Sequence, residues 1–541
     1  MKKIYYNGVI YTGKMPLEEA FVVENGHFIF SGDTKTALQM ATSEDEKVDL
    51  NGRFVCSGFN DSHMHLLGLG KLLGEAQLAK HTNCLEDMLL YLKEYAKETC
   101  RNEWILGRGW NQDYFQDVDR MPNRWDLDKV SVEKPVCIVR ACGHCLVVNS
   151  KALELLGITE ETPQPIGGNI GIEDGVLNGR FDDNAMDLVY EQIPVPEKDE
   201  IKHMLRSACK ALNASGITSC QTDDFCSSRK VPWNVIYEAY KELVESGDLT
   251  VRVYEQANLT NLDELNEFVA SGQVTGIGNP MFKTGPLKML GDGALGARTA
   301  YLSQPYADDA STCGIPVYSR EKLIEMIDFA NQNDMQVAVH AIGDACLDWV
   351  LEAFELALKK YPRENHRHGI VHCQITREDQ LKKIRELNLH VYAQSIFLDY
   401  DIHIVEARVG KELASTSYCW KTLMNKGVTV SNGSDCPVEW PDVMAGIQCA
   451  VLRKPLKNQG VKKEEVYLPE ECFTVQEAID SYTIWSAYSS FEENVKGAIA
   501  PGMFADFVVL EKNPFAVPKE QIKDIVVCET YLSGNQVYYH L

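Results

Sequence analysis

Two histidines one residue apart, His63 and His65, stand in the stretch SGFNDSHMHLLGLG (57–70), after a short apolar run and before several small residues. If the run forms a β-strand, the two imidazoles point to the same side, because side chains alternate across a pleated strand. Neutral imidazole is a common metal ligand in proteins. The spacing therefore suggests a metal site, although two polar residues on a solvated strand end would show the same pattern.

Four further polar residues end or follow apolar runs of a strand's length: Lys288 in GPLKMLGDG, His340 in QVAVHAIGD, His372 in GIVHCQ and Asp435 in VSNGSDCPV. Helix-like segments lie between these runs, and strands that alternate with helices predict parallel βαβ units. In a (β/α)₈ barrel the carboxyl ends of the strands meet at one face, so these side chains would converge with the histidine pair. The alternative is an open doubly wound sheet, but no Gly-x-Gly-x-x-Gly motif opens any of the helices.

Four histidines and one carboxylate suit zinc or a similar divalent ion, with one or two ions bound. Lys288 is unexpected in such a set, because an ammonium group repels a metal ion. A lysine buried among apolar residues has a lowered pKa and can act as a nucleophile. Its reaction with carbon dioxide would give a carbamate, an anionic oxygen ligand that can bridge two ions. The alternative reading of Lys288 is a surface lysine on a misassigned strand.

The composition indicates a globular protein without nucleic-acid or membrane partners. Of the 541 residues, 45% are hydrophobic and 24% are charged, and the formal net charge of −25 repels nucleic acid and anionic membrane surfaces. No apolar stretch is long enough to span a bilayer. The first residues, MKKIYYNGVIYTG, predict a β-strand and not a signal peptide. With 17 cysteines in no regular framework, we expect reduced thiols and a cytoplasmic protein.

By pattern the chain divides into three stretches, and the middle one contains an insertion. Residues 1–56 are rich in short strands with Asn-Gly turns, and residues 496–541 show the same texture. Neither end can bury a core alone, so we expect one β-sandwich built from both ends. Residues 57–495 would form the barrel, with an insertion at about residues 66–200 that is too long for a βα loop and is expected to cover the barrel mouth.

Several motifs resemble one family of enzymes. GFNDSHMHL, LGRGWNQ, GDGALGARTA, VAVHAIGDA, HGIVHCQ, GSDCPV and APGMFADFVVL resemble the amidohydrolase superfamily, and within it the amidohydrolase 3, YtcJ-like branch that includes N-substituted formamide deformylase. The resemblance extends over nearly the whole chain with the motifs in the same order. It implies a metal-bearing (β/α)₈ barrel with a small β-sandwich. It also implies metal-ligand roles for His63, His65, Lys288 (as the carbamate), His340, His372 and Asp435.

The expected reaction is hydrolysis of an amide-like C–N bond of a small molecule by metal-activated water. Asp435 would accept the proton of the water and later pass it to the leaving nitrogen. An N-acyl or N-formyl compound is the preferred substrate. Related metal chemistry on a lactone, a phosphoester or an amine to be deaminated is the alternative, and a non-catalytic barrel scaffold is another. A scaffold would be expected to have lost ligands, and here the set is complete.

Weaker candidates surround this set. Trp110, Asn111 and His144 lie in the insertion, in stretches typical of pocket-lining loops. Arg298 could bind a substrate carboxylate or pair with an acidic neighbour. Asp292 and Asp344 are candidates for partners that orient ligating groups, and Asp344 could equally cap a helix. A homodimer is expected on base rates alone.

Overall fold

A computed structural model describes residues 1–98, 103–141, 144–165, 167–226, 230–456 and 466–540. The chain forms two compact units, one of Met1–Leu69 with Leu205–Leu541 and the other of Gly70–Met204.

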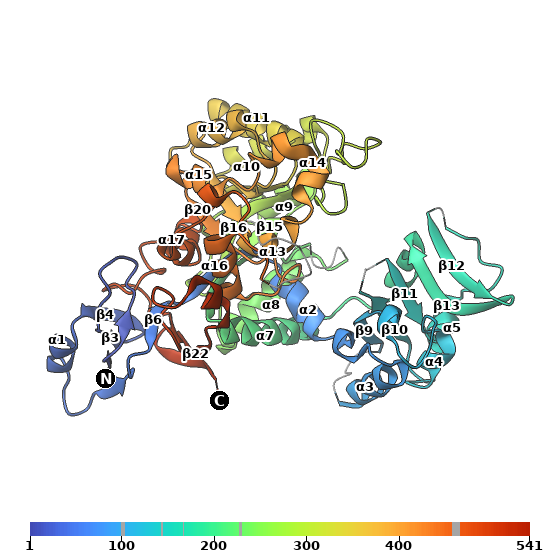
Figure 1. Ribbon diagram of the computed structural model, residues 1–541, viewed down its shortest axis with the longest axis horizontal. Coiled ribbons are helices and arrows are strands. Elements are labelled where there is room, and N and C mark those ends of the chain that lie inside the picture. Colours follow the sequence, from blue (N-terminus) through green and yellow to red (C-terminus); the bar gives the residue numbers. More distant parts are fainter. Residues whose placement is uncertain (99–102, 142–143, 166, 227–229, 457–465, 541) are drawn as a thin grey trace. The chain divides into compact units, whose positions relative to one another are not determined.

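The first unit contains a sheet of parallel strands that carries the predicted site (Figure 1). In spatial order its strands are β7 (Phe59–Met64), β14 (Ile217–Thr222), β15 (Arg252–Asn258), β16 (Phe282–Leu290), β17 (Val337–Ala341), β18 (Gly369–His372), β19 (His390–Ala393) and β20 (Val430–Asn432). Every neighbouring pair is parallel. Together they form a nearly closed eight-stranded barrel of the TIM type, as the alternating pattern predicts.

Backbone contacts bring the two outer strands of this sheet together. The Asp435 amide donates to the His63 carbonyl at 2.8 Å, and the His65 amide donates to the Cys436 carbonyl at 2.7 Å. Gly433 lies between them, where a Cβ would come within 2.6 Å of the His63 nitrogen. Only glycine permits this close approach, which places Asp435 beside the histidine pair.

Helices connect the strands of the barrel. They are α2 (Leu66–Leu73), α7 (Lys198–Ala214), α8 (Trp233–Ser246), α9 (Leu262–Ala270), α10 (Arg320–Gln332), α11 (Asp344–Lys360), α12 (Glu378–Glu386), α13 (Leu398–Asp401), α14 (Val405–Ala414) and α15 (Trp420–Asn425), followed by α16 (Val443–Leu452), α17 (Val475–Ser481) and α18 (Ile484–Ser489). In α10 the Ser319 side chain caps the first turn by accepting from the Lys322 amide. Its buried face repeats at helical spacing, with Leu323, Met326, Ile327 and Ala330.

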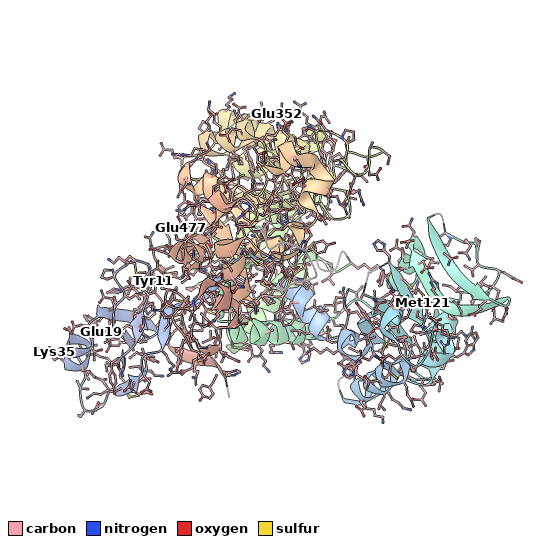
Figure 2. The ribbon with its side chains drawn as sticks, viewed as in Figure 1. Tyr11, Glu19, Lys35, Met121, Glu352 and Glu477 are labelled. Atoms are coloured by element: carbon pink, nitrogen blue, oxygen red, sulfur yellow. The ribbon has the colours of Figure 1, made fainter. Side chains whose placement is uncertain are left out.

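Two smaller sheets use both chain ends. The first consists of β1 (Lys2–Tyr6), β3 (Ala20–Glu24), β4 (His27–Gly32) and β5 (Glu46–Asp49), and the second of β2 (Val9–Ile10), β6 (Phe54–Ser57), β21 (Phe507–Leu510), β22 (Val527–Leu532) and β23 (Asn535–Tyr539). β6 pairs with β21, so the two chain ends share one sheet. Aromatic rings from both sheets pack together, with Tyr5 and Phe507 5.1 Å apart. Tyr11, labelled in Figure 2, donates to Asp480 of α17 at 2.7 Å and joins these sheets to the barrel.

The second unit has its own mixed six-stranded sheet. Its strands are β8 (Ala76–Gln77), β9 (Ile105–Trp110), β10 (Val136–Arg140), β11 (Cys145–Val148), β12 (Gly168–Glu173) and β13 (Val176–Asp183), with helices α3 (Leu85–Glu98), α4 (Arg124–Asp128), α5 (Ser150–Leu156) and α6 (Asp187–Tyr190). Side chains of β10 alternate between two apolar clusters, since Val136 and Ile138 belong to one and Cys137 to the other. A separate core supports each face of this sheet.

Among the described residues, no helix combines the length and the apolar character that crossing a membrane requires. None of the cysteines that the structure describes forms a disulfide with another described residue. Cys100 and Cys142 lie outside the described residues.

Candidate metal centre

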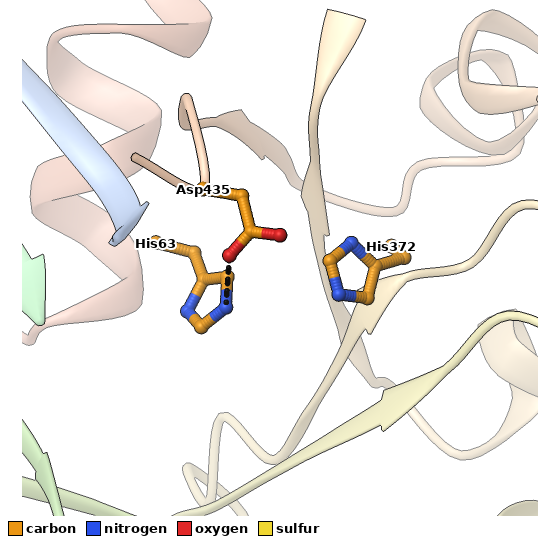
Figure 3. Close-up of side chains that lie close together, drawn as sticks. All are labelled: His63, His372 and Asp435. Carbon is orange, nitrogen blue, oxygen red and sulfur yellow. Dashed lines mark ion pairs between the residues drawn. The ribbon is translucent and has the colours of Figure 1, made fainter. Parts of the chain in front are cut away.

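Three of the predicted ligands form one buried cluster at the carboxyl end of the barrel strands. His63 comes from β7, His372 ends β18, and Asp435 follows β20. Their potential ligand atoms lie within 4.8 Å of one another. The His63 Nε2 is 3.2 Å from Asp435 Oδ1, and His372 lies beside this pair (Figure 3).

The second histidine of the pair reaches the same carboxylate oxygen. His65 Nε2 is 3.1 Å from Asp435 Oδ1, and His65 Nδ1 is 3.0 Å from the backbone carbonyl of Asp223. A carbonyl only accepts, so His65 must carry its proton on Nδ1, and in the neutral ring Nε2 holds a lone pair. Two acceptor atoms then face each other at 3.1 Å, an arrangement that is favourable only with a proton or a metal cation between them.

His340 stands next to this cluster, and its Nε2 contacts other residues. Its ring centroid is 4.4 Å from that of His372, at an interplanar angle of 80°. Its Nε2 lies 3.1 Å from the Gly293 carbonyl and 3.4 Å from Asp292 Oδ1, both acceptors. Nε2 is therefore protonated, and Nδ1 is the nitrogen that is free to bind an ion.

Lys288 is completely buried on β16. Its Nζ lies 3.4 Å from Asp223 Oδ2 and makes no hydrogen bond to any residue that the structure describes. Asp223 Oδ1 is also without a hydrogen-bond partner in the described part of the chain. Burying polar atoms without partners is costly, so these two side chains indicate that a further group completes the site.

The charges favour the protonation states that metal ligands need. Burial lowers the pKa of His372 well below its ordinary value, and the neighbouring His340 and Lys288 lower it further. Burial, and then Lys288, likewise lower the pKa of His63. Burial alone would raise the pKa of Asp435, but the adjoining His63 and His65 imidazoles outweigh it and hold the pKa well below its usual range. Neutral imidazoles and an ionised carboxylate are the ligand forms of these groups.

The pKa of His65 moves in the opposite direction. Burial alone would lower this pKa, but the hydrogen bond with Asp435, and then the one with Cys226, raise it well above its ordinary value. This raised pKa favours a proton between His65 and Asp435 in the ion-free protein, in the place that a cation would take.

The backbone is held in an uncommon conformation at two of these residues. His372 and Asp435 have φ values of 75° and 56°, in the left-handed region that non-glycine residues rarely adopt. Hydrogen bonds fix the second of these turns, because the buried Asp61 carboxylate accepts from the Ser434 amide at 3.0 Å and from the Ser434 hydroxyl at 2.5 Å. Such strain persists where the surrounding structure determines the position of a functional side chain.

The remaining barrel candidates have partners within the protein. Asp292 accepts from the amides of Ile342 and Gly343 at 3.0 and 2.8 Å, besides its approach to His340. Asp344 accepts from the Ser303 amide at 2.9 Å and from Arg377 at 2.6 Å, and it is the first residue of α11. Arg298 pairs with Asp308 at 3.0 Å. This is the second of the two roles considered for Arg298, an ion pair with an acidic neighbour.

Trp110, Asn111 and His144 lie in the second unit. Trp110 is fully buried in the core of that unit. Asn111 accepts from the Asp113 amide at 3.2 Å and from Arg140 at 2.9 Å. His144 is exposed, with Nδ1 3.2 Å from Asp183. Their roles in binding a substrate stay predictions.

Asp223 directly follows β14 but was not among the predicted site residues. The signal was the same as for the other candidates, a carboxylate after the buried run ITSCQT. Asp223 and Cys226 also lie near His65, with potential ligand atoms within 4.8 Å of one another.

A parallel (β/α)₈ barrel with histidines and a carboxylate gathered at the carboxyl ends of its strands has the features of the metal-dependent hydrolases. The model of the Amidohydrolase family matches residues 46–538, and the chain belongs to this family. It is a hydrolase of the amidohydrolase superfamily.

Individual relatives agree with this assignment. The chain is 34% identical to the amidohydrolase YtcJ of Bacillus subtilis (strain 168), over 99% of both chains. It is 23% identical to the N-substituted formamide deformylase of Arthrobacter pascens, over 95% of this chain and 94% of the relative. A metal-dependent hydrolase from Pyrococcus furiosus has a similar solved structure, with 29% identity, a TM-score of 0.78, and coverage of 95% of this chain and 100% of that chain.

Proposed function

We propose that this protein hydrolyses an amide-like C–N bond of a small molecule, with a water molecule activated at a divalent ion, zinc or a similar metal. His63, His65, His340, His372 and Asp435 would hold one or two ions. Lys288, as a carbamate, would supply a further anionic ligand. We also propose that the two sheets built from the chain ends form one β-sandwich.

The observation that carries this proposal is the convergence of acceptor atoms on one buried point. Asp435 Oδ1 lies 3.2 Å from His63 Nε2 and 3.1 Å from His65 Nε2. Packing alone does not explain a buried carboxylate that faces the lone pair of the His63 imidazole, since this arrangement costs free energy without a cation. A divalent cation suits this set of nitrogen and oxygen donors, which contains no thiolate.

Lys288 fits the same group. An amine that is buried, and that makes no hydrogen bond to a described residue, lies 3.4 Å from a carboxylate beside the histidines. Carboxylation would replace the N–H groups that repel a cation with anionic oxygens that attract one.

The chemistry follows from the positions of the protein groups. When bound, a divalent ion supplies Lewis acidity, which lowers the pKa of water toward neutrality and polarises a carbonyl group. Asp435 is ionised and can take the proton from the attacking water at its carboxylate. It can then deliver that proton to the leaving nitrogen, which would otherwise depart as an unstable anion.

Several metal-dependent hydrolases share this chemistry and differ in the bond that they cleave. We favour an N-formyl or N-acyl compound because the relative from Arthrobacter pascens is a formamide deformylase. Lactone or phosphoester hydrolysis and deamination are the alternative reactions, since substrate choice in a barrel enzyme depends on its loops.

The test is the metal content of protein purified without chelator, beside the variant His63→Ala. About one or two ions per chain in the native protein, lost in the variant, would support the site and justify screening N-formyl and N-acyl compounds against lactones and phosphoesters. If the native protein held no ion even after incubation with zinc and bicarbonate, the proposal would be wrong and a scaffold role would take its place.

A further inference from the structure

Two buried glutamines face the far side of the histidine cluster. Gln256, on β15, has its Oε1 2.7 Å from His63 Nδ1. Gln394, directly after β19, has its Oε1 2.7 Å from His372 Nδ1. Both glutamines are 0% exposed. β15 and β19 contribute no predicted ligand, and each brings one of these glutamines to the site.

The orientation of each carboxamide is fixed by a backbone carbonyl. Gln256 Nε2 donates to the Ser62 carbonyl at 3.1 Å, and Gln394 Nε2 donates to the Tyr392 carbonyl at 3.0 Å. A carbonyl oxygen accepts and cannot donate, so the NH₂ group must face it. The amide oxygen is then turned toward the histidine, and Nδ1 of that histidine must carry the hydrogen. In the neutral ring, Nε2 is left with its lone pair.

We propose that Gln256 and Gln394 are positioning residues that fix the tautomer and the ring orientation of His63 and His372, so that Nε2 of each ring is presented to a metal ion. This inference rests on the proposed function for the presence of the ion. The histidines that bind metals usually donate their other N–H to a neighbouring acceptor, and loss of that acceptor typically weakens metal affinity about 10–100-fold.

A glutamine suits both positions better than a glutamate. Each side chain must accept from an imidazole N–H at one end and donate to a backbone carbonyl at the other. A carboxylate can do the first and not the second, because its remaining oxygen would lie against the carbonyl of Ser62 or Tyr392 and repel it. The carboxamide therefore ties each histidine to a strand backbone: to β7 through Ser62, and to β19 through Tyr392.

The first test measures zinc affinity by competition with a chelator for Gln256→Met and Gln394→Met. We expect each variant to bind zinc about 10–100-fold more weakly than the native protein. Gln221→Met is the matched control: Gln221 lies on β14, is equally buried, and donates to the Ser486 carbonyl at 2.8 Å and to the Ser489 hydroxyl at 2.7 Å, away from the histidines. Its zinc affinity should not change. Equal affinity in folded Gln256→Met, Gln394→Met and native protein would overturn the inference.

A second test needs no folded glutamine variant and no metal. In native ion-free protein labelled with ¹⁵N-histidine, the nitrogen shifts of His63 and His372, assigned with His63→Asn and His372→Asn, should show a proton on Nδ1 of both rings. An unprotonated Nδ1 on either ring would refute the inference. Absence of zinc binding by the native protein would refute the proposed function instead, and the tautomer result would still stand on its own.

Discussion

A buried ion pair joins the barrel to the sheets made from the chain ends. Arg252 begins β15, and Asp506 immediately precedes β21. The guanidinium Nε donates to Asp506 Oδ2 at 2.6 Å and Nη2 donates to Asp506 Oδ1 at 3.1 Å. Both side chains are 3% exposed. The bidentate geometry and the burial make this pair a strong candidate for holding the two parts of the first unit together.

Replacing Asp506 with alanine should be severely destabilising. The Arg252 guanidinium would stay buried, and among the described residues it would keep the Ser533 hydroxyl and the Pro280 carbonyl as hydrogen-bonding oxygens, at 2.7 and 3.0 Å. Removing one partner of a buried ion pair costs about 3–5 kcal/mol. The Ser533 amide, which donates to Asp506 at 2.8 Å, would also lose its acceptor. We therefore expect a loss near the upper end of that range.

The assay is urea unfolding of ion-free protein, followed by tryptophan fluorescence. The double variant Arg252→Met, Asp506→Leu should regain most of the stability lost in Asp506→Ala, since no buried charge is left alone. Asp248→Ala is the control because it breaks an exposed pair with Arg206, where no measurable change in midpoint is expected. Equal midpoints for Asp506→Ala and Asp248→Ala, or additive losses in the double variant, would refute this account of the joint.

Three other outcomes are expected. Asp435→Asn should lower turnover about 10²–10⁴-fold while keeping part of the metal content, whereas His63→Ala should lose both, as paired metal analysis and kinetics would reveal. Lys288→Met should abolish any restoration of activity by bicarbonate, because it removes the amine that carbon dioxide would carboxylate, as an assay with and without bicarbonate would reveal. Burial alone would raise the pKa of Glu492 from 4.5, but Lys496 and Lys283 hold it at about 2. The ionised Glu492 therefore stabilises the fold above pH 4.5, and this contribution disappears as the pH falls toward 2. Glu492→Gln should flatten the acid side of a plot of Tm against pH, and the exposed Glu412→Gln should not.

The sequence predicted those parts of the site that depend on local pattern. His63, His372 and Asp435 each follow a buried run, and parallel strands bring their carboxyl ends to one face. Each residue could therefore be found by inspecting its own strand. Asp223 was available to the same reasoning, since it follows the strand that comes next after β7 in the sheet.

Other residues depend on contacts that no local pattern contains. The Asp61 carboxylate binds Ser434, which lies 373 residues further along the chain. Gln256 reaches His63 across 193 residues. A buried glutamine in a strand looks like any polar core residue until the fold shows which nitrogen it faces. The local sequence also left the position of Trp110 open, because an aromatic residue beside a turn can line a pocket or pack in a core. The structure places Trp110 within the core of the second unit.

Several features at the carboxyl ends of the barrel strands cost folding free energy, and this indicates that the site has a function beyond stabilising the fold. Two non-glycine residues, His372 and Asp435, have left-handed backbone conformations. A buried lysine nitrogen lies 3.4 Å from a carboxylate oxygen with no hydrogen bond to the described residues. The lone pair of His63 Nε2 faces the ionised Asp435 carboxylate at 3.2 Å. Each feature opposes folding when it stands alone. One bound cation would satisfy the carboxylate and the imidazoles together, which is why their coincidence points to an ion that the folded chain holds.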